Sequence, residues 1–135
     1  MTYHYETTML VRDYECDLQG IVNNANYLHY AEHTRHLFLK HCGLSFSEMH
    51  ENGEDAVVAR MNLQYKTPLR SDDEYLSCLR VKKEGLKYVF YQDIYRKADH
   101  KLSFRAQVEI VCLVNGRLGE SQACNEAFKP YLEEE

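Results

Sequence analysis

The residues that could carry chemistry gather between Asp13 and Glu32, in the stretch DYECDLQGIVNNANYLHYAE. Asp17 stands three residues before Gly20, and an amide-rich run over residues 23–26 follows shortly after. An aspartate can act as a nucleophile or as a general base that activates water. The free N–H groups at the start of a helix stabilise negative charge that develops on a substrate oxygen. A carboxylate beside such a helix start would suit acyl transfer.

The pattern after the amide-rich run is helical. One set of residues recurs three or four positions apart and shares a helix face: Tyr27, Tyr30, Ala31, Thr34 and Phe38. Either Asn26 or Asn24 could be the N-cap, because a short side-chain oxygen accepts from the first free amides. We predict a helix from about Asn26 to His41, ended by Gly43. Apolar residues on more than one side favour a helix enclosed by other structure.

This stretch resembles a known family. The string D-x-x-G-x-V-x-x-x-N-Y, formed here by Asp17, Gly20, Val22, Asn26 and Tyr27, resembles the hotdog-fold acyl-CoA thioesterases of the 4-hydroxybenzoyl-CoA thioesterase type. The resemblance implies hydrolysis of an acyl-CoA thioester to a free carboxylic acid and coenzyme A, without a cofactor. It implies a catalytic Asp17 without choosing between nucleophile and base.

Asn24 departs from the family pattern. Many similar members carry His or Tyr at this position, whereas the run from Val22 to Asn24 is similar to the V-N-N string of the acyl-carrier-protein thioesterases. The acyl carrier therefore stays open between coenzyme A and carrier protein. A non-catalytic acyl-binding hotdog module, with Asp17 closing its loop, is a further alternative.

The site residues take their expected roles from this motif. The backbone amides of Val22, Asn23 and Asn24 would donate to the oxyanion if the helix begins there. The Asn24 side chain could orient water or the thioester carbonyl, or cap the helix, but it cannot act as a base. Gly20 and Tyr27 are expected to contact the substrate.

Other reactive residues are weaker candidates. Cys16 is adjacent to Asp17, but its side chain would point the opposite way in an extended segment. Glu32 could support the site or pair with Arg35 or His36. The five cysteines lack paired spacing, and the seven histidines lack a motif such as H-E-x-x-H, so we expect free thiols and no metal.

The acyl carrier bears phosphates, so basic residues should mark its path. The basic residues of the second half of the chain gather around expected turns and strand ends: Lys66, Arg70, Lys82, Lys83 and Lys87. Lys66 and Arg70 are the expected substrate contacts.

Most of the chain after the helix is expected to be strand. The alternation of Val57, Ala59, Met61, Leu63 and Tyr65 with more polar neighbours predicts a strand over 57–66. Further strands are expected over 75–83, 86–94, 102–114 and, after an Asn115–Gly116 turn, 117–122. A first strand over 3–12, a short helix over 45–52 capped by Ser45, and an acidic tail over 125–135 that could start as helix complete the pattern.

One long helix followed by antiparallel strands with one strict apolar face indicates an α+β layer. Periodicity alone leaves several helix-on-sheet folds open. With the resemblance, it predicts a hotdog fold, an antiparallel sheet wrapped around one long central helix, in a single domain over residues 1–135.

Composition limits the partners. The net charge of −5 gives no support for nucleic-acid binding. No apolar run approaches the roughly 20 residues of a membrane span, and the first ten residues lack the pattern of a signal peptide. We expect a cytoplasmic protein without a nucleic-acid or membrane partner. An exposed sheet edge is usually covered, and similar subunits pair edge to edge, which predicts a homodimer or homotetramer with the site at the interface.

Overall fold

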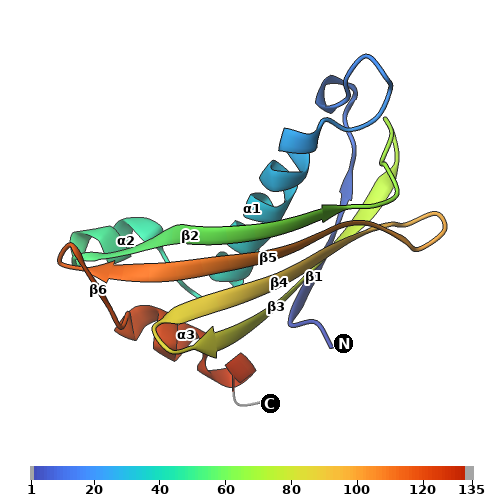
Figure 1. Cartoon of the computed structure of the whole chain (residues 1–135). Coiled ribbons are helices and arrows are strands. Elements are labelled where there is room, and N and C mark those ends of the chain that lie inside the picture. The colour runs from blue at the N-terminus through green and yellow to red at the C-terminus, as the bar shows by residue number, and fades with distance from the viewer. Residues whose placement is uncertain (1, 133–135) are drawn as a thin grey trace.

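Figure 1 shows the computed structural model of the chain, in which residues 2–132 are described. Within this range, the elements in chain order are β1 (Tyr5–Leu10), a 3-10 turn (Asp13–Glu15), α1 (Asn24–His41), α2 (Phe46–Glu51), β2 (Glu54–Tyr65), β3 (Glu74–Glu84), β4 (Lys87–Arg96), β5 (Lys101–Val114), β6 (Arg117–Gly119) and α3 (Gln122–Leu132).

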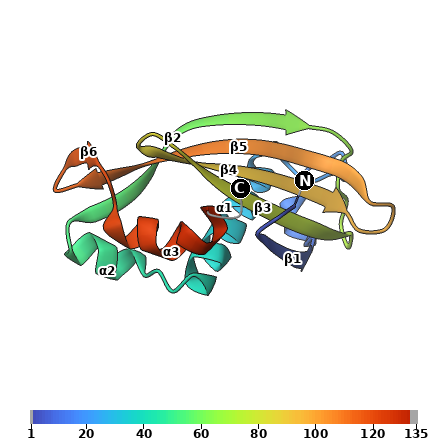
Figure 2. The ribbon, with the colours of Figure 1, turned by 90° about the horizontal axis from the view of Figure 1, so that it is seen from below.

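The strands form one curled antiparallel sheet. Their order is β1-β3-β4-β5-β2, and β6 pairs with the end of β5. The long helix α1 packs against the concave side of the sheet, and α2 and α3 lie on the same side (Figures 1 and 2). This is the predicted α+β arrangement, a sheet that curls around one long helix.

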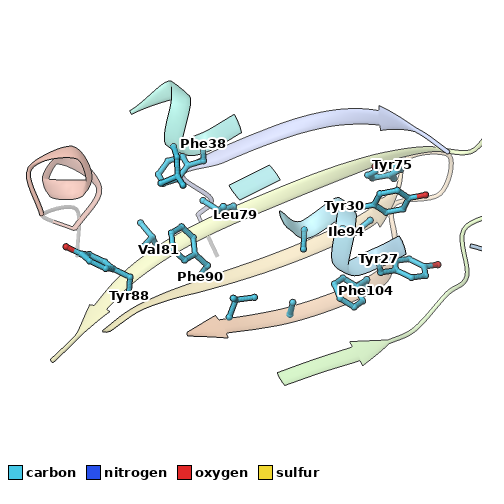
Figure 3. Close-up of a cluster of buried hydrophobic side chains, with 14 of the residues drawn as sticks. Tyr27, Tyr30, Phe38, Tyr75, Leu79, Val81, Tyr88, Phe90, Ile94 and Phe104 are labelled. Carbon is cyan, nitrogen blue, oxygen red and sulfur yellow. The ribbon is translucent and has the colours of Figure 1, made fainter. Parts of the chain in front are cut away.

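The predicted helix face is confirmed, because its five residues are all buried. Tyr30 stacks on Tyr75 of β3 with ring centroids 4.6 Å apart, and Tyr27 stacks on Phe104 of β5 at 5.3 Å. Figure 3 shows these rings at the start of α1, whereas Phe38 lies near the other end of the helix, beside Leu79. Aromatic rings therefore fix the first turns of α1 against the sheet, which positions the residues that precede the helix.

The strand β2 differs from its predicted alternation. The pairing with β5 shifts between Val58 and Arg60, so Ala59 is the extra residue of a β-bulge. A bulge reverses which side of the strand faces the core. Before it, Ala56 and Val58 face a cavity on the helix side; after it, Met61 and Leu63 pack against the core. The prediction of one continuous face from Val57 to Tyr65 is therefore wrong.

Several element bounds also differ from those predicted. Helix α1 begins two residues earlier, β2 begins at Glu54, and β1 covers only Tyr5–Leu10. The last strand ends at Gly119, because Ser121 instead accepts a hydrogen bond from the Cys124 amide (3.1 Å) and α3 follows directly. The acidic tail thus begins inside a helix; residues 133–135 lie outside the described range. The capping of α2 by Ser45 is confirmed.

One edge of the sheet is β2, and it carries exposed apolar side chains. Val57 is 39% exposed, Val58 47% and Tyr65 43%. An exposed apolar edge strand offers unpaired backbone groups and apolar surface together, a combination that proteins usually cover.

Candidate active site

Asp17 opens a tight turn. Its amide donates to the Ile21 carbonyl (2.9 Å), and the Gly20 amide donates back to the Asp17 carbonyl (3.0 Å). Gly20 has a φ of +78°, a conformation that residues with a Cβ rarely adopt. One Asp17 carboxylate oxygen accepts from the Gln19 amide (2.9 Å). The other accepts no hydrogen bond from residues 2–132, and the residue is exposed. The carboxylate thus closes the turn and still presents an oxygen outward.

The turn is held by the segment that follows β2. The Val22 amide donates to the Leu69 carbonyl (2.8 Å), and the Leu69 amide donates to the phenolic oxygen of Tyr27 (2.9 Å). Leu69 and Val22 are both buried. These bonds anchor the segment between the Asp17 turn and α1 on the buried residue Leu69.

A buried carboxylate, Glu15, joins the turn to the helix. It accepts hydrogen bonds from the Arg12 amide (2.8 Å), the Arg12 guanidinium (2.8 and 3.1 Å) and the Tyr30 hydroxyl (2.8 Å). Its backbone carbonyl accepts from the Asn23 amide (3.0 Å) and the Asn26 side chain (2.7 Å). Burial raises the pKa of Glu15, but the bonds from Arg12 and Tyr30 outweigh this and hold the pKa below its ordinary value. Sequence reasoning missed Glu15: Arg12 is close in sequence, but nothing in the sequence signals the contact with Tyr30, 15 residues away.

The N-cap of α1 is Asn23, whose side chain accepts from the Ala25 amide (2.9 Å). The prediction that Asn24 or Asn26 caps the helix is therefore wrong. The chain path decides the outcome, since Glu15 takes the Asn23 amide and leaves that residue extended, with ψ of 142°. Asn26 instead donates to the Glu15 carbonyl, and Asn24 becomes the exposed first residue of the helix.

The backbone amides of the predicted oxyanion site differ in availability. Those of Val22 and Asn23 already donate to Leu69 and Glu15. The Asn24 amide has no hydrogen-bond acceptor among residues 2–132. An oxyanion needs N–H donors that are not already hydrogen-bonded. Of the three predicted donors, the Asn24 amide therefore meets this condition, whereas the amides of Val22 and Asn23 do not.

The predicted basic cluster is split between the two ends of the sheet. Lys66 follows β2, and the Arg70 guanidinium lies beside Gly20, 4.0 Å from where a Cβ would be. The remaining three, Lys82, Lys83 and Lys87, lie at the β3–β4 turn, the opposite end of the sheet. Lys83 pairs there with Glu120, and Lys87 with Glu109 at 2.8 Å. Only Lys66 and Arg70 lie at the end of the sheet that carries the Asp17 turn.

The cysteines and the possible metal ligands do not form part of the Asp17 site. Burial, and then the carboxylates of Asp13, Glu15 and Asp17, raise the pKa of the Cys16 thiol, which disfavours the nucleophilic thiolate. All five cysteines are free thiols. Within residues 2–132, no three His, Cys, Asp or Glu side chains are placed to hold a metal ion.

An apolar cavity of about 110 Å³ lies between the second half of α1 and the sheet. Its walls come from α1, α2, α3 and strands β2, β4 and β5, and they include Leu39, Phe46, Val58, Phe90 and Phe128. Phe46 and Val58 are exposed, so the cavity opens toward the β2 edge. Glu32 is also part of its wall.

A family model described as the Thioesterase-like superfamily matches residues 11–129. The chain belongs to this superfamily. The matched range holds the Asp17 turn, α1 and all the strands from β2 to β6.

None of the helices in residues 2–132 is long and apolar enough to cross a membrane.

Two proteins of similar sequence carry the names of thioesterases. YneP of Bacillus subtilis, which its name assigns provisionally as an acyl-CoA thioesterase, is 33% identical over 104 residues, or 76% of this chain and 75% of its own length. The acyl-acyl carrier protein thioesterase ATL3 of Arabidopsis thaliana is 33% identical over 91 residues, 67% of this chain but 48% of its own. The chain thus spans about half the length of this chloroplast relative.

Solved structures show the same fold. Slr0204 of Synechocystis, a 1,4-dihydroxy-2-naphthoyl-CoA thioesterase, superposes with a TM-score of 0.85 at 16% identity, over 93% of this chain and 95% of its own. The protein SAV2348 of Staphylococcus aureus, solved in complex with CoA, gives 0.87 at 15% identity, over 98% and 87%. At such low identity the likeness supports the fold alone.

Proposed function

We propose that this chain is an acyl-CoA thioesterase that hydrolyses an acyl-CoA to a free carboxylic acid and coenzyme A. The observation that carries the proposal is the exposed Asp17 carboxylate, in the turn that leads into α1, together with the Asn24 amide at the helix start, which has no acceptor among residues 2–132. Membership of the Thioesterase-like superfamily supports it. The finer assignment to the 4-hydroxybenzoyl-CoA thioesterase type rests on the motif from Asp17 to Tyr27 alone.

The chemistry follows from these two groups. Asp17 either attacks the thioester carbonyl carbon directly or removes a proton from the water that attacks it. In both routes the carbonyl oxygen becomes negative, and the Asn24 amide stabilises it together with the dipole of α1. The carbon–sulfur bond then breaks, and coenzyme A leaves as the thiol once it has taken up a proton. When water attacks, this step releases the free acid directly; when Asp17 attacks, it leaves a mixed anhydride on Asp17, which water hydrolyses to the free acid and the restored carboxylate.

The complete site is proposed to form in a homodimer, through antiparallel pairing of two β2 strands. Tyr65 ends β2 near the helix start, and Val58 lies toward the other end, at the cavity mouth. Antiparallel pairing about the middle of the strand puts the Tyr65 end of one copy beside the Glu54 end of the other, and Val58 lies in that half of the strand. The Asp17 turn of one subunit would then face the apolar cavity of its partner, which would receive the acyl chain.

The test is Asp17→Asn, assayed with a panel of acyl-CoA thioesters by release of thiol. Asparagine keeps the shape of the side chain and can still accept from Gln19, but it loses the charge. We expect kcat to fall by about 10² or more, the usual contribution of general acid–base catalysis, with KM little changed. A melting curve on the same samples controls for folding. A folded Asp17→Asn variant that retains most of its kcat would contradict the proposal.

A carrier-protein thioesterase is the second candidate. It is favoured by the run Val22-Asn23-Asn24 and by the name of the Arabidopsis relative ATL3. Matched acyl-CoA and acyl-carrier-protein substrates with the same acyl chain separate the two candidates. Inhibition by free coenzyme A, without binding of the carrier protein, would support the CoA assignment.

A further inference from the structure

Arg35 is a buried cation in the wall of the apolar cavity. Its side chain comes from α1, and the residue is only 7% exposed. Its Nη1 donates to the Gln92 side-chain oxygen (2.9 Å), and Gln92 in turn donates to the Ala31 carbonyl (2.9 Å). A guanidinium has five N–H donors, and within residues 2–132 the bond to Gln92 leaves most of them without a protein acceptor.

The charge of Arg35 lacks a counterion among the residues that the structure describes. No carboxylate in residues 2–132 forms an ion pair with it. The nearest acidic influence is Glu32, one turn earlier on α1, which is exposed and lies in the same cavity wall. Burial lowers the pKa of the Arg35 guanidinium, and Glu32 only partly opposes this, but an arginine stays charged in proteins.

An unpaired buried charge is costly, and buried charges in proteins are normally paired. An ordinary alkyl chain in this cavity would exclude water from Arg35 and leave the charge worse solvated. A chain that brought its own oxygen acceptor would instead satisfy the free donors. The cavity of about 110 Å³ has room for several non-hydrogen atoms beside Arg35, since one water needs only roughly 10–15 Å³.

We propose that Arg35 is a specificity-determining residue, which selects acyl groups that carry an oxygen acceptor on the chain, away from the thioester. This inference rests on the proposed function, because it takes the cavity as the acyl site. A carboxylate at the far end of the chain fits best, since it can accept two bonds from a guanidinium and neutralises its charge. A hydroxyl at the same position shares the acceptor chemistry without the charge.

The test compares hexanoyl-CoA, 6-hydroxyhexanoyl-CoA and adipyl-CoA, which share chain length and differ at the far end. The variants are Arg35→Met, Arg35→Lys and, as a matched control, Arg117→Met on the exposed strand β6. We expect the wild type to favour adipyl-CoA over hexanoyl-CoA by about tenfold or more in kcat/KM, the size of a buried charged hydrogen bond. Arg35→Met should abolish this preference, and Arg35→Lys should keep part of it. Arg117→Met should behave as wild type.

Binding of free adipate and hexanoate by calorimetry gives a readout that does not need turnover. If thioesters are hydrolysed but Arg35→Met lowers kcat/KM equally for all three, the specificity role is wrong and the proposed function stands. If no thioester is hydrolysed but adipate binding depends on Arg35, the proposed function is wrong and the recognition by Arg35 stands. A preference of the folded wild type for hexanoyl-CoA would overturn the inference. If 6-hydroxyhexanoyl-CoA is favoured over hexanoyl-CoA as strongly as adipyl-CoA is, Arg35 selects the substrate by hydrogen bonding and not by charge.

Discussion

The phenolic hydroxyl of Tyr65 donates a hydrogen bond to the backbone carbonyl of Asn24, with 3.2 Å between the two oxygens. Tyr65 ends the exposed edge strand β2, and Asn24 is the first residue of α1. The Tyr65 ring also packs edge-on against Tyr27, with centroids 5.6 Å apart. The edge that would pair with a second copy is thus tied directly to the helix start that would hold the oxyanion.

This relationship predicts the effect of Tyr65→Phe. The substitution keeps the ring against Tyr27 and removes only the bond to Asn24. We expect little change in stability, because a half-exposed hydrogen bond contributes about 0.5–1.5 kcal/mol. We expect kcat to fall severalfold, because the helix start loses one of its restraints. Steady-state kinetics beside a thermal melt check this; unchanged kcat would show that Asn24 is positioned without Tyr65.

The role of the Asn24 amide can be tested by removing that single N–H with Asn24→Pro. Proline is well accepted at the first helical position, and Asn23 already has the extended conformation that a residue before proline requires. We expect a folded protein whose kcat falls by about 10²–10³, as when an oxyanion donor is lost. Asn24→Ala is the matched control, since it keeps the amide and should lose much less. Equal losses in the two variants would assign the effect to the side chain.

Sequence reasoning found the groups that local patterns determine. The buried face of α1 was predictable because Tyr27, Tyr30 and Phe38 follow helical spacing. The β-bulge was not, because the extra residue Ala59 leaves the apparent alternation intact while reversing its faces. The element order and the antiparallel sheet were therefore accessible, but the side of β2 that lines the cavity was not.

At the candidate site, too, the sequence predicted the features that local patterns determine and missed those that depend on other segments. Asp17 and its turn could be read locally, because Asp and Gly favour such turns. The helix cap could not, since Asn23 was selected by a carbonyl of Glu15. From the sequence alone, Arg35 is interpreted as a surface partner of Glu32, three residues earlier. Its burial depends on Gln92, 57 residues away on β4. Contacts between distant segments decided each residue that the sequence misplaced.

Glu15 predicts a pH-dependent stability. Its pKa is held below the ordinary value, so the ionised carboxylate stabilises the fold above that value, and this contribution is lost as the pH falls through the folded-state pKa. Glu15→Gln should therefore destabilise the protein by about 1–3 kcal/mol near neutral pH. The gap between variant and wild type should narrow as the pH falls below the ordinary range of a glutamate pKa, and close once the pH is below the lower folded-state pKa, where the wild-type carboxylate is protonated. Urea unfolding at several pH values measures this, and a gap independent of pH would contradict it.

Lys66 and Arg70 are proposed to contact the phosphates of coenzyme A. Both are exposed, so salt should screen them. We expect KM for an acyl-CoA to rise with ionic strength while kcat changes far less. A truncated thioester without the nucleotide should lose this response. Lys66→Gln and Arg70→Gln should raise KM and reduce its salt dependence, whereas Lys40→Gln, at an exposed position in the last turn of α1, serves as the control. If KM for both substrates depended equally on salt, the proposed contact with the coenzyme A phosphates would be wrong.

The dimer proposal makes the last prediction, through Val57 on the exposed edge strand β2. In antiparallel pairing about a two-fold axis, Val57→Lys places a charge from each copy in the same interface, and charges on an edge strand oppose such pairing. Light scattering should then give the 15.9 kDa monomer, where the wild type gives at least twice that mass.

The same variant should lose thioesterase activity while it keeps its circular dichroism spectrum, because the Asp17 turn would no longer face a partner's cavity. Leu118→Lys is the matched control, since Leu118 is an exposed apolar residue on β6, away from the β2 edge. It should remain dimeric and active. A monomeric Val57→Lys protein with full activity would mean that each subunit holds a complete site. A Val57→Lys protein that remains dimeric would mean that the dimer interface does not include β2.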